Sequence, residues 1–73
     1  MTKSLYSNEH KKLVEQLKKA RKEAGVDQRD VAMALGKTQS YVSKIEAGQR
    51  RIDVVQLKEL AKIYKKTVSF FIQ

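Results

Sequence analysis

Three glycines divide the middle of this sequence into segments of similar length. Gly25, Gly36 and Gly48 stand 11 and 12 residues apart, and each follows a segment with helical periodicity. A helix commonly ends at a residue with positive φ, a conformation that glycine adopts at little steric cost. The sequence contains no proline and no alternating, β-branched run flanked by turn residues. We therefore predict an all-α domain, a compact bundle of four to five short helices with tight connections.

The apolar periodicity indicates where these helices lie. We expect helices over 8–24 (starting at Ser7 or Asn8), 28–35, 38–47 and 54–65, and a short fifth helix over 67–73. Asp27 and Thr38 are suited to cap the second and third helices. Val14 and Arg21 lie at the edge of the first apolar stripe, and Met33 at the rim of the core. The residues expected to face the core are Leu13, Leu17, Ala20, Ala24, Val31, Ala32, Leu35, Tyr41, Val42, Ile45, Leu57, Leu60, Ala61, Tyr64, Val68, Phe71 and Ile72.

The length and the lack of cysteine restrict the class of protein. We expect one domain over residues 1–73, with residues 1–7 as a flexible N-terminal arm. Without cysteine there is no disulfide, thiolate metal site or cysteine nucleophile. A small domain without disulfides or metal sites is typical of the reducing cytoplasm, where we expect this protein. No apolar run approaches the roughly 18–20 residues that span a bilayer, and we expect no signal peptide.

The charge balance is strongly basic. Sixteen Lys and Arg residues against eight Asp and Glu residues give a net charge of +8. Such an excess in one small domain favours phosphate, an acidic protein or an anionic membrane as the partner. The alternative is a lysine-rich surface that only keeps the domain soluble. The pattern along the chain separates these possibilities better than the charge does.

The predicted third helix has an unusual outward face. Opposite its apolar side this helix carries no acid and presents Gln39, Ser40, Ser43 and Lys44. Solvent-exposed helix faces usually carry Glu, Lys and Arg, and serine is a mediocre helix former. Glutamine can bond adenine through two hydrogen bonds, serine can donate or accept, and lysine reaches guanine or a phosphate. We interpret the four residues as base readers in the major groove of DNA, with an ordinary solvent-exposed face as the alternative.

Residues on both sides of this helix are suited to contact the DNA backbone. Gln28 opens the preceding helix, whose N-terminus attracts anions. Lys37 and Thr38 lie in the turn between the two helices, and Arg50 and Arg51 follow the third helix. Backbone contacts set affinity and register, whereas base contacts select the sequence. For Arg50 and Arg51 the alternative is an ordinary solvated pair of charges.

These residues resemble the phage-repressor/Cro-type helix-turn-helix family, also called the XRE family. The resemblance covers about residues 13–72 and rests on Gln28, on Leu-Gly at 35–36, on Val-Ser-x-Ile-Glu-x-Gly at 42–48 and on Leu-x-x-Leu-Ala at 57–61. It implies a lambda-repressor-like bundle whose second and third helices form the helix-turn-helix unit. It also implies a regulator of transcription that binds double-stranded DNA.

The resemblance implies roles for individual residues. Gln28 would bind a phosphate and orient Gln39, and Gln39, Ser40 and Lys44 would read bases. Ser43 would lie against the backbone or a base edge.

Arg21 and Glu46 would form a partly buried ion pair in such a family member. Both border apolar arcs, where a lone charge needs a partner.

The chain departs from the family pattern at two places. Arg51-Ile52-Asp53 replaces a frequent proline. Tyr41 is bulky, so that it either packs at the rim of the domain or stacks on the DNA backbone, and we include it among the candidate backbone contacts.

Other functions find less support in the sequence. His10 is the only histidine and lies on a polar stretch, and no glycine-rich phosphate loop is present, so we expect neither enzyme activity nor a cofactor or metal. The first helix has no Trp or Phe anchor for a membrane, and no aromatic platform for RNA bases is evident. The main alternative is a protein-interaction module that keeps the helix-turn-helix fold, such as an antitoxin or co-regulator with an unknown protein partner.

One such unit reads few base pairs, so the sequence favours a homodimer. We expect a repressor that binds palindromic half-sites about 34 Å apart. Ile63 lies off the main stripe of its helix, and Phe70 adds apolar surface near the C-terminus, so these residues are the candidate dimer surface. The alternative is a C-terminal segment folded back onto its own core.

Overall fold

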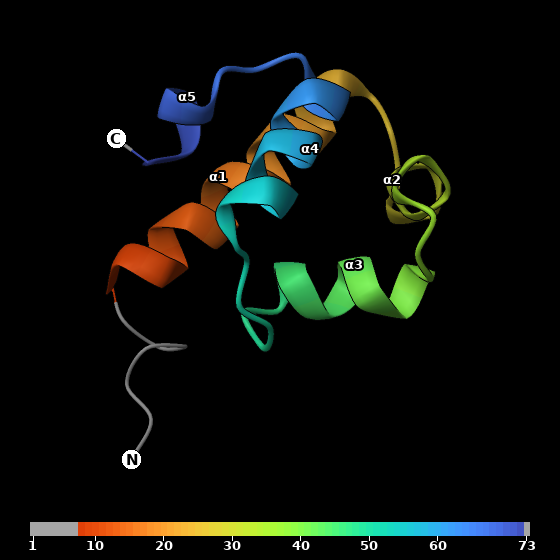
Figure 1. Cartoon of the computed structure of the whole chain (residues 1–73), viewed down its shortest axis with the longest axis horizontal. Coiled ribbons are helices and arrows are strands. Elements are labelled where there is room, and N and C mark those ends of the chain that lie inside the picture. Colours follow the sequence, from red (N-terminus) through yellow and green to blue (C-terminus); the bar gives the residue numbers. More distant parts are fainter. Residues whose placement is uncertain (1–7, 73) are drawn as a thin grey trace.

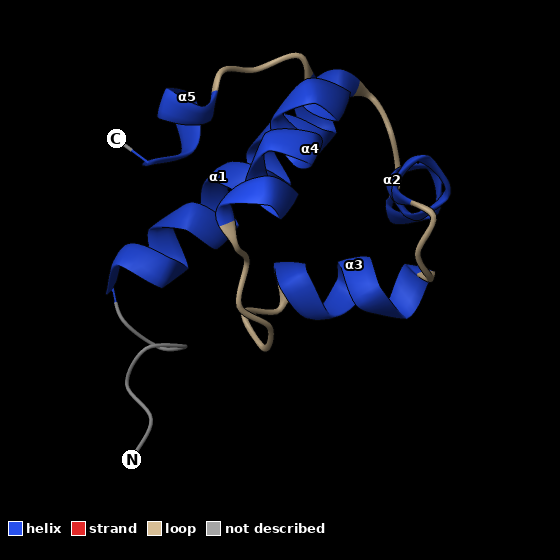
Figure 2. Ribbon diagram, viewed as in Figure 1, coloured by secondary structure: helices blue, strands red, loops and turns tan. Residues whose placement is uncertain are grey.

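The computed structural model describes residues 8–72, which form five helices and their connections (Figures 1 and 2). The helices are α1 (Asn8–Ala24), α2 (Gln28–Leu35), α3 (Gln39–Glu46), α4 (Val54–Tyr64) and α5 (Val68–Ile72). No strand occurs within the described residues. The predicted all-α fold is confirmed, and every helix boundary lies within one residue of its expected place. The expected arm over residues 1–7 lies outside the described residues.

Side chains that precede the helices fix where they begin. Asp27 Oδ1 accepts a hydrogen bond from the Asp30 amide at 2.9 Å, and Asp30 Oδ2 accepts one from the Asp27 amide at 3.1 Å. This reciprocal capping box satisfies two amides at the start of α2. The Thr38 hydroxyl oxygen accepts from the Tyr41 amide at 3.1 Å, which starts α3 directly after the turn. The predicted caps Asp27 and Thr38 are therefore confirmed.

Left-handed residues end the helices and set the angle between α2 and α3. Gly36 has φ +69°, and the amides of Gly36 and Lys37 donate to the Met33 and Ala32 carbonyls at 3.2 and 2.9 Å. These two bonds close the end of α2, and α3 then leaves at a steep angle (Figure 1). At the end of α4 the same role falls to Lys65, with φ 58°. Lys65 is the only described residue other than glycine with a positive φ.

The core lies where all five helices meet. α2 and α3 pack against each other, α1 contacts α3, α4 and α5, and α4 also contacts α2 and α5. In Figure 1, α3 forms one edge of the molecule, so one side of this helix has no neighbouring element among the described residues. The buried side chains include Leu17, Val31, Val42, Ile45, Leu57, Leu60, Tyr64 and Phe71.

Three side chains expected at the core face solvent instead. Ala24 is exposed because it ends α1 at the turn toward α2, whereas Val14, expected at the edge, is buried. Met33 is 78% exposed, because α2 is only two turns long and packs through Val31 and Ala32. Ile72 is 64% exposed, since α5 turns Phe71 into the core.

The neighbour of Phe71 explains the exposure of Ile72. Phe70 packs beside Phe71 in an edge-to-face contact with 5.1 Å between ring centroids. Its carbonyl oxygen accepts a hydrogen bond from Gln16 Nε2 of α1 at 3.2 Å. Residues two apart on a helix point to nearly opposite sides, so packing of Phe70 directs Ile72 outward.

None of the helices over residues 8–72 combines the length and the apolar character that crossing a membrane requires.

Candidate nucleic-acid interface

The outward side of α3 presents the four predicted base readers together. Gln39, Ser40, Ser43 and Lys44 are all exposed, while Val42 and Ile45 on the inward side are 1% and 2% exposed. Because the inward side is fixed by packing, the orientation of the outward side is fixed with it. The Thr38 cap and the short turn from Gly36 hold the start of this helix against α2. The four polar side chains therefore project from a rigid element.

The start of α2 lies beside the start of α3. Gln28 and Gln39 line the same shallow hollow, together with Arg21, Asp27 and Arg29. Gln28 is half-buried and Gln39 is exposed. The structure thus brings together Gln28 and Gln39, which we expect to contact a phosphate and a base, respectively.

Arg21, which lines this hollow, forms an ion pair with Glu46. Arg21 Nε lies 2.7 Å from Glu46 Oε2, and the two side chains are 15% and 5% exposed. Arg21 Nη1 also donates to the Val26 carbonyl at 3.1 Å, which ties the connection between α1 and α2 to the same guanidinium. The hydrogen bond to Glu46 raises the pKa of Arg21 above its ordinary value, against the opposing effect of burial. This ion pair links α1 to the last residue of α3.

Glu46 has a second partner, which could not be predicted from the sequence. Gln28 Nε2 donates to Glu46 Oε1 at 3.0 Å. Both carboxylate oxygens of the one acid in α3 are therefore engaged inside the protein. A side-chain amide carries two donor hydrogens, so Gln28 keeps one for an outside acceptor such as a phosphate. The bond to Glu46 also restricts the rotamer of Gln28.

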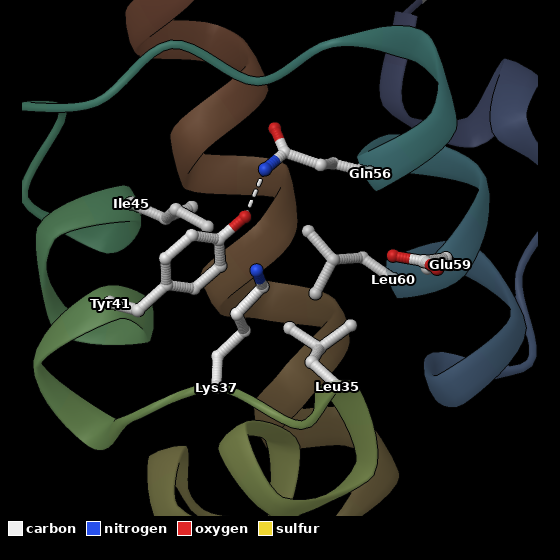
Figure 3. Close-up of a pocket in the computed structure, with 7 residues that line it drawn as sticks. All are labelled: Leu35, Lys37, Tyr41, Ile45, Gln56, Glu59 and Leu60. Atoms are coloured by element: carbon white, nitrogen blue, oxygen red, sulfur yellow. Dashed lines mark hydrogen bonds between the residues drawn. The ribbon is translucent and has the colours of Figure 1, made fainter.

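Tyr41 lies between the two ends of the interface. Its ring is half-buried, and the Arg50 guanidinium carbon lies 4.5 Å from the ring centroid. Lys37 Nζ lies 5.4 Å from the same centroid. The Tyr41 hydroxyl accepts a hydrogen bond from Gln56 Nε2 of α4 (Figure 3). One ring thus contacts a cation from the turn before α3 and another from the loop after it.

Figure 3 shows the hollow beside this ring. It has a volume of about 290 Å³ and lies between the α2–α3 turn, α3 and α4. The Lys37 side chain extends across the hollow between Tyr41 and Leu60. Lys37, Thr38, Arg50 and Arg51 are exposed, as contacts to a DNA backbone require.

Gln56 and Arg29 belong to this region, although we did not predict either of them from the sequence. Gln56 Oε1 accepts a hydrogen bond from the Asp53 backbone amide at 3.1 Å. Asp53 Oδ1 accepts one from the Gln56 backbone amide at 2.7 Å, so the two residues form the capping box of α4. The spacing Asp-x-x-Gln before an apolar helix could have predicted this box. Arg29 adds a cation to the hollow that holds Gln28 and Gln39, and its place next to Gln28 was the available signal.

The residues considered for a dimer surface lie on the opposite part of the bundle. Ile63 and Phe70 are both half-buried and pack against the core of their own chain. Lys66 Nζ lies 4.8 Å from the Phe70 ring centroid and 3.0 Å from Glu23 Oε1. These contacts hold α5 against α1, and they leave only part of each apolar side chain open to a partner.

Comparison with protein families agrees with this geometry. A family model described as helix-turn-helix matches residues 17–71, from the middle of α1 to the end of α5. The matched segment contains every residue of the interface described above. No individual curated protein matches the sequence.

Proposed function

Since the chain belongs to this helix-turn-helix family, we propose that it regulates transcription by binding a specific double-stranded DNA sequence through α3 in the major groove. The observation that carries the proposal is the exposed, acid-free face of Gln39, Ser40, Ser43 and Lys44 on a helix whose other side is buried. Gln39 and Lys44 can each bond a purine edge in the major groove. The two serines are short enough to let the helix approach the bases closely.

The neighbouring residues supply the backbone contacts in this proposal. Gln28 and Thr38 lie at the starts of α2 and α3, where helix N-termini favour phosphate. Lys37, Arg50 and Arg51 add cations on both sides of α3. Glu46 does not oppose them, because Arg21 neutralises its carboxylate inside the domain. Arg29 is a further cation beside Gln28.

We also propose a homodimer that acts as a repressor on a palindromic operator. One α3 reaches only a few base pairs, and two copies related by a two-fold axis double the length that is read. The C-terminal end is the proposed dimer surface, with the open parts of Ile63 and Phe70 and with Ile72, which is 64% exposed. Light scattering after size exclusion, on the protein alone and on its site, checks the dimer. A monomer in both states would contradict it.

Selection from a randomised duplex pool at about 0.15 M salt tests the proposal as a whole. We expect enrichment of an inverted repeat whose half-sites are about one helical turn, roughly 34 Å, apart. Enrichment of a single short site would support sequence-specific binding and contradict the dimer. A pool that stays random, with weak and salt-sensitive retention, would contradict specific DNA binding and favour the alternative of a protein-interaction module.

A further inference from the structure

We propose that Tyr41 is a positioning residue that holds Arg50 and Lys37 in place for the DNA backbone on both sides of α3. This inference rests on the proposed function, because it concerns how that interface is organised. It assigns Tyr41 the role of a platform inside the protein, rather than a group that stacks on the DNA. The observations behind it are two cation contacts to one ring and a hydrogen bond that fixes the ring.

The two cations come from different connections. Lys37 belongs to the turn between α2 and α3, and Arg50 belongs to the loop between α3 and α4. Their charged groups lie 5.4 and 4.5 Å from the Tyr41 centroid, within the roughly 6 Å over which a cation is attracted to an aromatic face. Tyr41 itself sits in the first turn of α3. The ring therefore joins both cations to the helix that carries the base readers.

The ring is held from the side of α4. Gln56 Nε2 donates to the Tyr41 hydroxyl, while Gln56 Oε1 accepts from the Asp53 amide at 3.1 Å. The nitrogen and the oxygen of the Gln56 side-chain amide are thus both hydrogen-bonded, and these two bonds restrict its rotation. Figure 3 shows Gln56 reaching from α4 toward the hydroxyl, with Lys37 lying beside the ring. The start of α4, the loop after α3 and α3 itself are connected through this one tyrosine.

The benefit for binding comes from preorganisation. A free arginine or lysine side chain samples many rotamers, and fixing them on a phosphate costs conformational entropy. A guanidinium stacked on Tyr41 has lost part of that freedom before DNA arrives, and its outer N–H groups remain available as donors. Loss of the ring should therefore weaken DNA binding through Arg50 and Lys37, even though the ring itself need not touch DNA.

A double-mutant cycle between Tyr41 and Arg50 tests this role. Binding of the full chain to its selected duplex is measured for the parent, Tyr41→Leu, Arg50→Ala and the double variant. From the usual strength of exposed cation–aromatic contacts, we expect Tyr41→Leu to weaken binding roughly fivefold in the parent. In the Arg50→Ala background the same change should weaken binding by no more than about twofold. Equal effects in both backgrounds would overturn the proposal.

Two controls separate the ring from the hydroxyl and from general damage. Tyr41→Phe keeps the platform and should bind within about twofold of the parent. Lys44→Ala replaces Arg50→Ala in a control cycle, because the Lys44 ammonium makes no ring contact within residues 8–72. Tyr41→Leu and Lys44→Ala should act independently. Coupling as strong as that with Arg50 would show a general disturbance of α3 and contradict the proposal.

A measurement without DNA distinguishes this inference from the proposed function. In the free protein, the Tyr41 ring current should shift the Arg50 side-chain protons upfield in NMR spectra, and Tyr41→Leu should abolish that shift. Absence of the shift in a protein that binds DNA would overturn the positioning role alone. A protein that shows the shift but binds no duplex would overturn the proposed function, and the DNA-positioning role with it.

Discussion

Removing the Arg21 side chain tests the ion pair that joins α1 to α3. Glu46 is 6% exposed in the parent, and in Arg21→Ala it loses the guanidinium that lies 2.7 Å from its carboxylate. The Val26 carbonyl loses its donor as well. Only Gln28 Nε2 still donates to Glu46, so a charge is left largely buried with a neutral partner.

The size of the loss follows from this geometry. Breaking a buried ion pair from one side destabilises a protein by about 3–5 kcal/mol. The remaining bond from Gln28 and the 15% exposure of the Arg21 side chain place the expected loss at the lower end, about 3 kcal/mol. A domain of this length has a total stability of about 4–10 kcal/mol. The melting temperature should fall on the order of 12–24 °C.

Thermal and urea unfolding followed by far-ultraviolet circular dichroism measure this loss. Lys22→Ala is the matched control, because it removes an exposed cation from the next position of α1 and should change stability by no more than about 0.5 kcal/mol. The double variant Arg21→Met/Glu46→Leu should recover much of the loss, since no charge is then left without a partner. An Arg21→Ala melt that coincides with that of Lys22→Ala would contradict a stabilising role for the Arg21–Glu46 ion pair.

Three further predictions concern stability and DNA binding. Lys65→Gly should stabilise the domain by about 0.5–1 kcal/mol in urea unfolding, because Lys65 ends α4 with φ 58°; an unchanged midpoint would count against strain at this residue. Burial raises the pKa of Tyr64 to about 12, whereas an unfolded tyrosine titrates near 10. The unfolded state therefore loses its proton first, and stability should fall by about 2 kcal/mol as pH rises from 10 to 12. Tyr64→Phe should remove that part of the alkaline loss, and equal pH profiles for parent and variant would contradict the shift. Gln39→Ala should reduce the binding free energy that discriminates the preferred base at one position by roughly 1–3 kcal/mol. Arg50→Ala should instead weaken binding to all duplexes and reduce the slope of log affinity against log salt concentration by about one unit. Titrations at several salt concentrations check this division, and an unchanged sequence preference in Gln39→Ala would contradict it.

Much of the backbone could be predicted because its signals are local. The capping residues Asp27 and Thr38 and the glycine at position 36 act on neighbours within a few residues. Periodicity within one helix likewise placed Val31, Val42 and Leu57 in the core. The end of α4 fell within one residue of expectation, although Lys65 gives no glycine signal for a left-handed residue.

The contacts that organise the interface were harder to foresee. Gln28 and Glu46 are 18 residues apart, and Tyr41 and Gln56 are 15 apart. Whether such polar side chains meet depends on the angles between helices and on rotamers, which periodicity does not encode. Phe70 and Ile72 show the same limit in the core. A helix as short as α5 can rotate slightly and exchange which apolar side chain it buries.

In the proposed function, the outward face of α3 is the surface that meets DNA. Titration of the ¹⁵N-labelled protein with its selected duplex at about 0.15 M salt, followed by amide chemical shifts, tests it most directly. We expect the largest changes over residues 37–44 and at the starts of α2 and of the loop after α3, with small changes on the exposed side of α1. Changes concentrated on α1 or α5, with the amides of Gln39, Ser40, Ser43 and Lys44 unmoved, would contradict it.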